Sequence, residues 1–374
     1  MKIAHVVDSM EVGGAEMLVS RMCRLQREQG HAPLVFAVSS LGPLGEGLRK
    51  DGFVVQPNVG RHLCDATRNY FRIFKESRPD VVHLHNSTAT IYGAVAARLA
   101  GVPSIISTRH SLVAPPRDRV AEFKYAIASR FCDWIVGVCD ATVYNVKRMH
   151  TVPGRKIVRI YNGAVPLSRV DKEKWPSKTG FTLLYVGRLE PVKNLALLLN
   201  AFGAALAPMP GLRLWMVGDG SQRAMLESLA RALGVLDKVT FWGQQLDVPR
   251  FFSAADAFIM SSKSEGLPVS LLEAFSLGVP AIVTDVGGMA EAVRIAQAGF
   301  TVSVTGPAEM TSAIVRMAGD SAERERFSKN GENAFVKRFT LQAMVDAYMD
   351  LYQKTPRRAR LHPSSGHKQP SLPA

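Results

Sequence analysis

The sequence predicts an α/β protein of two successive domains, each built on a parallel sheet with helices on its faces. Three observations support this prediction. The chain has 374 residues, which at about 150 residues a domain corresponds to two domains. Short apolar runs alternate with helix-like segments, as in β-α-β units. A polar, proline-containing stretch at 165–179 interrupts the alternation near the middle of the chain.

The first half contains six predicted strands, each a short apolar run bounded by polar residues or glycine. They lie at 2–7, 33–39, 53–56, 81–84, 104–108 and 134–138. Apolar residues at helical spacing predict helices between them, at 15–29, 66–77, 90–100 and 118–131. Gly30 and Gly101 follow two of these segments and are typical helix stop signals.

The same alternation restarts after the central stretch. Strands are predicted at 183–186, 214–217, 240–241, 257–260 and 281–284. Helices are predicted at 195–207, 221–233, 249–254, 268–277, 289–296, 307–318, 321–338 and 340–352. We therefore expect two tandem Rossmann-like domains, at 1–165 and 166–340, followed by a helix at 341–352. The proline- and serine-rich end at 353–374 is expected to be a disordered basic tail.

The positive charge of the chain is unevenly distributed. The formal net charge is +14, and residues 1–170 hold 23 basic and 13 acidic side chains. Such a field attracts phosphates, whether in nucleic acid, anionic lipid or a phosphorylated substrate. Nucleic acid is not favoured, because no recognition-helix motif is present and aromatic residues do not interleave with the basic ones. An anionic membrane surface remains a candidate partner.

Targeting signals are not evident in the sequence. No run reaches the roughly 18 apolar residues of a transmembrane helix. The first residues, MKIAHVVDSMEVGGAE, carry acids and glycines where a signal peptide needs an apolar core. We therefore expect a cytoplasmic protein.

The residues that follow strands in the second half are candidates for ligand binding, because open α/β sheets bind ligands beyond the carboxyl ends of their strands. Glycines at 187, 218 and 243 lie in these positions and would let a backbone approach a ligand closely. Arg188 and Lys193 bracket a turn that leads into a predicted helix. Cations beside a helix N-terminus form a diphosphate site in principle.

The segment 261–288 combines an anion site with two acids. Pro268 is expected at the first helical position, so that the N–H groups of Gly266 and Leu267 point at an anion. Glu265 and Glu273 lie eight residues apart in this segment. Carboxylates repel phosphate but accept hydrogen bonds from sugar hydroxyls. A nucleotide-sugar offers a ligand for both the cations and the acids.

The motifs in this order resemble those of glycosyltransferase family 4, retaining enzymes with the GT-B fold. The resemblance rests on GGAE at 13–16, DVVHLH at 80–85, ISTRHS at 106–111, YNGAV at 161–165 and VGRLEPVKN at 186–194, together with the two-glutamate segment. It implies two Rossmann-like domains with a cleft between them. It also implies a C-terminal helix at 341–352 that packs back on the first domain.

The resemblance also implies the role of each site residue. Arg188 and Lys193 would neutralise the donor diphosphate, so that no metal is needed, and the sequence contains no Asp-x-Asp motif. Glu265, with Gly266 and Leu267, would hold the donor sugar and phosphate. Glu273 would bind the ribose, Gly218 and Gly243 would pack near the base, and Gly187 would lie in the turn that binds the diphosphate. Gly13 and Gly14 would contact the phosphate or the acceptor. His110 would contact the donor sugar.

A retaining transferase would move a sugar from a nucleotide-diphosphate sugar to a lipid-linked or polysaccharide acceptor. UDP is the commonest donor nucleotide in the family. The expected pathway is envelope or exopolysaccharide synthesis, and no cofactor is expected. His85 is placed near the cleft, and His83 is assigned to the opposite face of the sheet. The basic and apolar segment 112–131 is a candidate for membrane contact at the inner face of the plasma membrane.

Other function classes compete with this interpretation. A Rossmann oxidoreductase needs Gly-x-Gly-x-x-Gly after its first strand, and EVGGAE lacks that spacing. A nucleotide-sugar epimerase of the GT-B fold stays open as an alternative, although it would not need a basic first domain. A non-catalytic homologue is disfavoured by the presence of Arg188, Lys193, Glu265 and Glu273 together.

Overall fold

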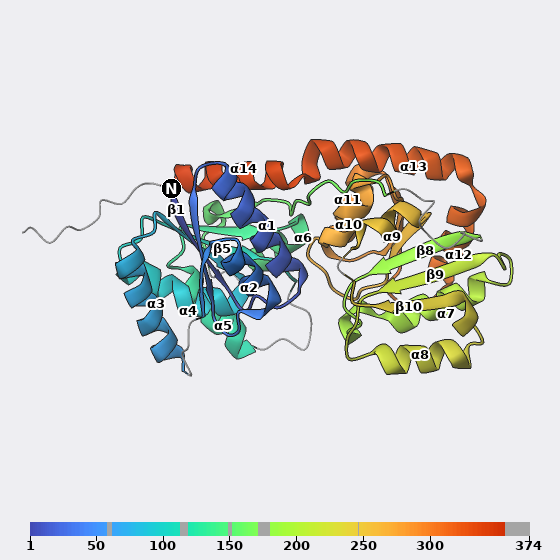
Figure 1. Cartoon of the computed structure of the whole chain (residues 1–374), viewed down its shortest axis with the longest axis horizontal. Helices are drawn as coiled ribbons and strands as arrows, with labels where there is room; N and C mark the ends of the chain where they lie inside the picture. Colours follow the sequence, from blue (N-terminus) through green and yellow to red (C-terminus); the bar gives the residue numbers. More distant parts are fainter. Residues whose placement is uncertain (58–61, 113–118, 149–151, 171–179, 246, 356–374) are drawn as a thin grey trace, which may run out of the picture.

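The computed structural model describes residues 1–57, 62–112, 119–148, 152–170, 180–245 and 247–355. Within these ranges the chain forms two α/β domains side by side, each with one sheet whose strands all run parallel (Figure 1). The predicted fold class is therefore confirmed. Most of the predicted tail, and residues 171–179 of the central stretch, lie outside the described residues. No described helix has both the length and the apolar character needed to span a membrane.

The first sheet has seven strands in the order β3-β2-β1-β4-β5-β6-β7. In the register of the central strands, His5 lies opposite His83, and His85 lies opposite Thr108. The sequence prediction missed the last strand, which has only three residues. The strands are β1 (Lys2–Val7), β2 (Ala32–Ala37), β3 (Val54–Pro57), β4 (Val81–His85), β5 (Ser104–Arg109), β6 (Trp134–Gly137) and β7 (Ile157–Arg159).

Helices cover both faces of this sheet and enclose two apolar layers. One layer is centred on buried residues such as Tyr70 and Ile105, and the other on residues such as Ile3 and Val136. Two of the helices, α2 and α6, were not predicted, because each is short and has few buried residues. The helices are α1 (Gly14–Glu28), α2 (Gly42–Lys50), α3 (Leu63–Ser77), α4 (Asn86–Leu99), α5 (Arg119–Ser129) and α6 (Asp140–Arg148), with a 3-10 turn at Gly154–Lys156.

The second sheet has six strands in the order β10-β9-β8-β11-β12-β13. They are β8 (Phe181–Val186), β9 (Leu212–Val217), β10 (Val239–Gly243), β11 (Ala257–Met260), β12 (Ala281–Thr284) and β13 (Gly299–Val302). The helices are α7 (Leu195–Ala205), α8 (Arg223–Ala232), α9 (Pro249–Ala254), α10 (Val269–Ser276), α11 (Gly287–Ala296), α12 (Ala308–Gly319) and α13 (Ser321–Ala334), with 3-10 turns at Pro191–Lys193 and Leu236–Lys238.

The chain passes between the domains twice, and the two passages pair with each other. After α13, a π-helical turn at Phe335–Phe339 leads into α14 (Leu341–Lys354). The N–H of Ala164 donates to the carbonyl of Phe339 at 2.9 Å, and the N–H of Leu341 donates to the carbonyl of Ala164 at 2.8 Å. These two bonds fasten both crossings together at one place.

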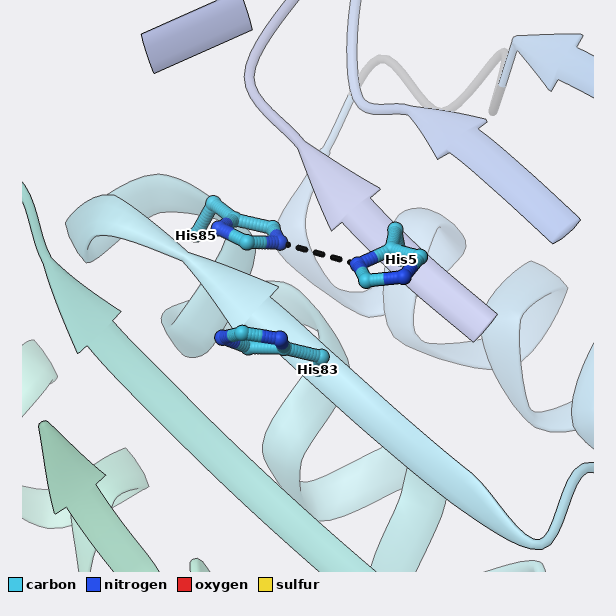
Figure 2. Close-up of side chains that lie close together, drawn as sticks. All are labelled: His5, His83 and His85. Carbon is cyan, nitrogen blue, oxygen red and sulfur yellow. Dashed lines mark hydrogen bonds between the residues drawn. The ribbon is translucent and has the colours of Figure 1, made fainter. Parts of the chain in front are cut away.

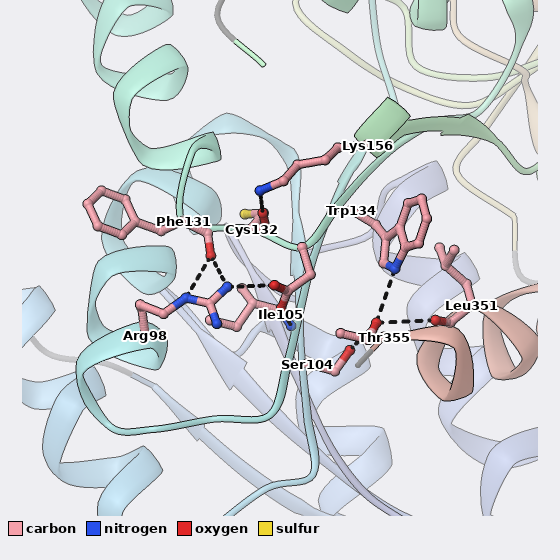
Figure 3. A network of polar contacts seen from close by, with 10 residues as sticks. Arg98, Ser104, Ile105, Phe131, Cys132, Trp134, Lys156, Leu351 and Thr355 are labelled. Atoms are coloured by element: carbon pink, nitrogen blue, oxygen red, sulfur yellow. Dashed lines mark hydrogen bonds and ion pairs between the residues drawn. The ribbon is translucent and has the colours of Figure 1, made fainter. Parts of the chain in front are cut away.

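Helix α14 lies along the first domain, although it follows the second in sequence (Figure 1). Its buried residues Val345 and Tyr348 share a core with Ile3 and Ile106 of the first sheet. Just beyond the helix, the Thr355 hydroxyl lies 3.0 Å from that of Ser104 and accepts from the Trp134 indole at 3.1 Å (Figure 3). Figure 3 also shows Arg98 donating to the carbonyl of Phe131, in the segment that follows α5. The last helix is therefore a structural part of the first domain.

Candidate active site

Lys193 and Glu265 meet at the carboxyl end of the second sheet. Lys193 closes the 3-10 turn that follows β8, and Glu265 lies in the loop after β11. Their side chains form an ion pair, and both are largely buried. The Ser262 hydroxyl donates to the same Glu265 oxygen at 2.9 Å, and the Ser261 hydroxyl donates to the Lys193 carbonyl at 2.9 Å. The turn and the loop are thus held together by a fixed cation and a fixed carboxylate.

Arg188 lies between the end of β8 and this turn. The residue is exposed, and its charge acts on Glu16 at the start of α1. Burial raises the pKa of the Glu16 carboxyl, the nearby charge of Asp8 raises it further, and the Arg188 charge opposes this shift. Arg188 also acts on the buried Tyr185 hydroxyl, whose pKa is raised mainly by burial and also by the charge of Glu265. The Tyr185 hydroxyl donates to the Arg188 carbonyl at 2.8 Å, so this buried tyrosine is bound to the Arg188 backbone and is affected by the charges of both Arg188 and Glu265.

Glu273 is bound by a residue of the other domain. It lies on α10 with 8% of its surface exposed, and it accepts from Arg21 of α1 at 2.8 Å. Burial raises the pKa of the Glu273 carboxyl, and the Arg21 charge partly offsets the rise. A ligand hydroxyl that bound Glu273 would have to share or replace this partner.

The loop between Glu265 and α10 packs directly on the first domain. A Cβ on Gly266 would lie 2.0 Å from the carbonyl oxygen of His110, so only glycine fits. Asn162 donates its amide N–H to the carbonyl of Leu267 at 2.8 Å, while the Leu267 side chain belongs to the apolar core. Pro268 was expected at the first helical position, and this is wrong. It is the extended residue before α10, with ψ of 131°, so Gly266 and Leu267 lie in a loop rather than in a helical turn.

The other predicted glycines differ in how strictly they are required. Gly218 has φ of +135°, and a Cβ there would lie 1.9 Å from the carbonyl of Gly187. Gly13 caps α1, where a Cβ would meet the Glu16 carboxylate at 2.2 Å. Gly14 has nothing within 4 Å of its added Cβ and stays open. Gly243 pairs with Gly218 in an isolated bridge, which places it beside the same turn.

His85 and His110 lie together beside the interdomain loop. The Nδ1 of His85 is 3.0 Å from the Nε2 of His110, and Figure 2 shows His85 bonded on its other side to His5. The prediction that His83 and His85 face opposite sides of the sheet is wrong. Positions i and i+2 of a strand share a face, and the two ring centroids are 4.0 Å apart.

The structure therefore brings the predicted residues to one boundary. Arg188, Lys193, Glu265 and Glu273 approach it from the second domain, and Gly13 and His110 approach it from the first. Sequence reasoning assigned no role to Arg21 or Asn162, which bind Glu273 and the Leu267 carbonyl. The only signal for Asn162 was its place in YNGAV, and Arg21 carried no local signal.

Comparison with known proteins identifies the family. Residues 168–334 match the family described as glycosyl transferases group 1, and residues 12–166 match glycosyltransferase family 4. The chain belongs to the group 1 glycosyltransferases. It is 28% identical over 381 residues to a UDP-Gal:alpha-D-GlcNAc-diphosphoundecaprenol alpha-1,3-galactosyltransferase of Escherichia coli, with 94% of this chain and 96% of that protein covered. It is 30% identical over 202 residues to the lipopolysaccharide core biosynthesis glycosyltransferase LpsE of Rhizobium meliloti, covering 54% of this chain and 58% of LpsE.

Solved structures of glycosyltransferases share the fold. Anabaena HepE in complex with UDP-glucose superimposes with a TM-score of 0.82 at 20% identity, covering 94% of this chain and 99% of HepE. WaaG, a glycosyltransferase involved in lipopolysaccharide biosynthesis, superimposes with a TM-score of 0.73 at 18% identity, covering 94% of this chain and 100% of WaaG. The glycosyltransferase therefore has the GT-B fold, with two Rossmann-like domains.

Proposed function

We propose that this glycosyltransferase moves a sugar from a UDP-sugar to a lipid-linked or polysaccharide acceptor, with retention at the anomeric carbon and without a metal ion. The pathway we propose is envelope or exopolysaccharide synthesis at the cytoplasmic face of the membrane. The similarity to an enzyme named for a UDP-galactose donor and a diphosphoundecaprenol acceptor supports both substrate classes.

One observation carries the proposal. Lys193 and Arg188 both follow β8 in the second domain. Lys193 pairs with Glu265 of the same domain, and the Arg188 charge acts on Glu16 of the first domain. This arrangement of cations supports a diphosphate at the domain boundary as their ligand. Phosphate oxygens form charge-assisted hydrogen bonds just as carboxylates do, so a diphosphate can compete with Glu265 for Lys193 and bind Arg188 as well.

The proposed reaction needs no side-chain nucleophile. The bond between the anomeric carbon and the phosphate oxygen breaks, and the acceptor oxygen bonds to the same face of that carbon. The leaving phosphate takes the acceptor's proton, while Arg188 and Lys193 neutralise the charge that develops on the diphosphate. Glu265 and Glu273 accept hydrogen bonds from hydroxyls of the sugar and the ribose.

A thermal-shift screen of nucleotide-sugars tests the donor assignment. A ligand at 100 times its dissociation constant stabilises the folded state by about 2.7 kcal/mol. We expect UDP and UDP-sugars to raise Tm, with GDP-sugars and NAD as comparisons. NMR of the product then reads the anomeric configuration. An inverted product would rule out retention, and stabilisation by NAD alone would rule out the donor class.

Membrane contact is proposed for α5 and for Arg130 and Phe131, which follow it. Phe123 and Ile127 are 67% and 45% exposed on one side of this helix, and Phe131 is exposed beyond its end. Lys124 and Arg130 are exposed beside them. Basic residues flanking an apolar stripe suit an anionic membrane surface. Arg117 of the predicted segment lies outside the described residues.

Liposome flotation tests this contact. We expect the protein to float with vesicles that contain anionic lipid and much less with neutral vesicles. Phe123→Ser should weaken flotation, whereas Val336→Ser should not, because Val336 is a 71% exposed apolar residue far from α5, on the π-helical turn. Equal flotation with both lipid types would contradict the proposal.

A further inference from the structure

Three histidines, of which His5 and His85 are buried and His110 is half-buried, lie in a row between two side-chain amides of the first domain. The Nε2 of His5 bonds to the Gln26 amide oxygen at 2.8 Å, and the Nδ1 of His5 lies 3.1 Å from the Nε2 of His85. His85 continues to His110 at 3.0 Å. Figure 2 shows the His5–His85 bond beside His83. The chain runs from α1 through β1 and β4 to the end of β5.

The chain ends at Asn162, which connects it to the second domain. The amide nitrogen of Asn162 donates to the Leu267 carbonyl, so its oxygen is left to accept. That oxygen and the Nδ1 of His110 are both buried, and neither has a partner of ordinary hydrogen-bond geometry among the described residues. The two side chains nevertheless interact. Burial lowers the pKa of His110, and the smaller effect of the Asn162 side chain raises it.

Counting protons exposes a conflict in this arrangement. The chain contains four links, from Gln26 to His5, His85, His110 and Asn162, and each link needs one proton. Three neutral imidazoles supply three protons. If amide oxygens accept at both ends, the chain lacks one proton. Either the chain carries an additional proton, or one terminal amide donates.

The Gln26 amide resolves the conflict by turning over. Its nitrogen is also buried without a partner among the described residues, and an amide can exchange its nitrogen and oxygen with little change in shape. Once turned, its nitrogen donates to His5, and its oxygen can accept from the neighbouring Tyr352 hydroxyl. Both Gln26 atoms then have partners, and the Nδ1 of His110 becomes a donor opposite the Asn162 oxygen, the roles in which the other two unpaired buried atoms complement each other.

The same direction of hydrogen bonding, with Nδ1 as donor and Nε2 as acceptor, applies to His83 beside the histidine chain. Its Nδ1 lies 2.7 Å from the Tyr352 hydroxyl, and its Nε2 lies 2.7 Å from the Thr108 hydroxyl. If Tyr352 donates to Gln26, its oxygen accepts from the Nδ1 of His83, and Thr108 donates to the Nε2. Both ring nitrogens of His83 are therefore used by hydroxyls. This argues against a metal ion among His5, His83 and His85, although their nitrogens lie within 4.8 Å of one another.

We propose that Gln26, His5 and His85 are positioning residues for the loop between Glu265 and α10, called the donor loop from here on. They hold it through a neutral chain of Nδ1-protonated histidines that ends at Asn162. Burial supports the neutral state, since it lowers the pKa of His5 and of His110 to about 4. The loop is fixed at two adjacent points, by Asn162 at the Leu267 carbonyl and by the His110 carbonyl against Gly266. Its effect on the donor rests on the proposed function, whereas the chain itself does not.

Long-range nitrogen–proton NMR of histidine-labelled protein tests the chain without any substrate. We expect four imidazoles that do not titrate between pH 5.5 and 8, each with a proton on Nδ1 and none on Nε2. A chain of Nε2-protonated rings, or one charged imidazolium, would overturn the proposal. So would a shift of these signals by one equivalent of Zn²⁺, since the nitrogens would then be metal ligands.

Nucleotide binding by matched variants tests the link to the donor loop. We expect Gln26→Leu and Asn162→Leu each to weaken UDP binding about three- to tenfold, the effect of losing one buried hydrogen bond. In both variants the kcat at saturating donor should change less than the KM for the donor. Thr90→Val is the control, because it removes a buried bond to Ser107 in the same domain but outside the chain.

The outcomes separate the two proposals. If all three variants weaken UDP binding equally, or none does, the chain does not position the loop. If the wild-type protein binds no nucleotide, the proposed function fails, and the NMR result still decides the protonation of the chain. Gln26→Glu adds a spectroscopic signature. Its carboxylate can only accept, so His5 should gain a proton on Nε2 and become charged.

Discussion

The two sides of the domain boundary solve the same positioning problem with different chemistry. On the second domain, Lys193 and Glu265 form an ion pair with side chains 13% and 15% exposed. On the first domain, His5 and His85 are buried to 0% and 3% and are held by neutral hydrogen bonds. The second domain keeps charged side chains that are partly accessible to water, whereas the first domain uses neutral side chains that are shielded from water.

This difference separates exchangeable contacts from permanent ones. Breaking a largely buried ion pair is costly unless a new partner replaces the lost one, and a phosphate is such a partner for the Lys193 cation. A buried polar group that loses its partner costs about 1–3 kcal/mol, so the histidine chain should stay intact while ligands come and go. The charged side should therefore dominate activity, and the neutral side should dominate stability.

The largest expected effect is on turnover, from the charged side. Lys193→Ala or Arg188→Ala each removes a charge-assisted contact worth on the order of 1.5–3 kcal/mol, a tenfold or greater loss. The double variant should lose about a hundredfold or more by the same reasoning. The measurement is initial rate at saturating donor. Lys329→Ala is the control, because its ion pair with Glu325 is 69% exposed on α13. Near-normal turnover in the double variant would refute the diphosphate assignment.

The next effect is on stability as a function of pH, from the neutral side. Burial lowers the pKa of both His5 and His110 to about 4, so between pH 6.5 and 4 the unfolded state binds more protons. Stability should therefore fall on acidification, by about 3 kcal/mol for each histidine over the full range. Urea unfolding at pH 6.5, 5.5 and 4.5 measures this. A flat profile would mean that these rings are charged in the folded state.

The sequence predicted the frame of this boundary because its parts are local. Buried strands are continuous apolar runs, and the loops after them carry the glycines and charged residues, as at Arg188 and Glu265. These signals depend on neighbouring residues only. The same locality explains the missed elements, since β7, β13, α2 and α6 are short and have few buried apolar positions to reveal them.

Contacts between distant residues could not be predicted in the same way. Arg21 and Glu273 are separated by 252 positions, and nothing in either segment points to the other. The histidine chain was missed for a different reason. A single His within KIAHVV marks an unusual polar group in a buried strand, but only the register of β1, β4 and β5 shows that several such residues share one face.

Arg21 sharpens the comparison, because its partner Glu273 lies on the charged side but is nearly buried. We expect Arg21→Ala to lower the ligand-free unfolding free energy by about 1–3 kcal/mol, since it leaves a buried carboxyl without a partner. Added UDP should narrow that gap, because ribose hydroxyls replace the lost donor. Tm with and without UDP measures both effects. Arg24→Ala is the control, because Arg24 lies on the same helix as Arg21 but forms an exposed ion pair with Asp51, and it should change Tm little. If UDP leaves the Tm difference between Arg21→Ala and the wild type unchanged, Glu273 does not bind the ribose.

The smallest expected effect is none, and it concerns metal removal. If Arg188 and Lys193 supply the positive charge that the departing diphosphate needs, a divalent cation is not required for the chemical step. Initial rates after EDTA treatment should then equal those of the untreated enzyme, and added Mg²⁺ should not raise them. A loss that Mg²⁺ restores would show that the two cations are insufficient, and the Lys193–Glu265 pair would then have to be interpreted as a structural contact.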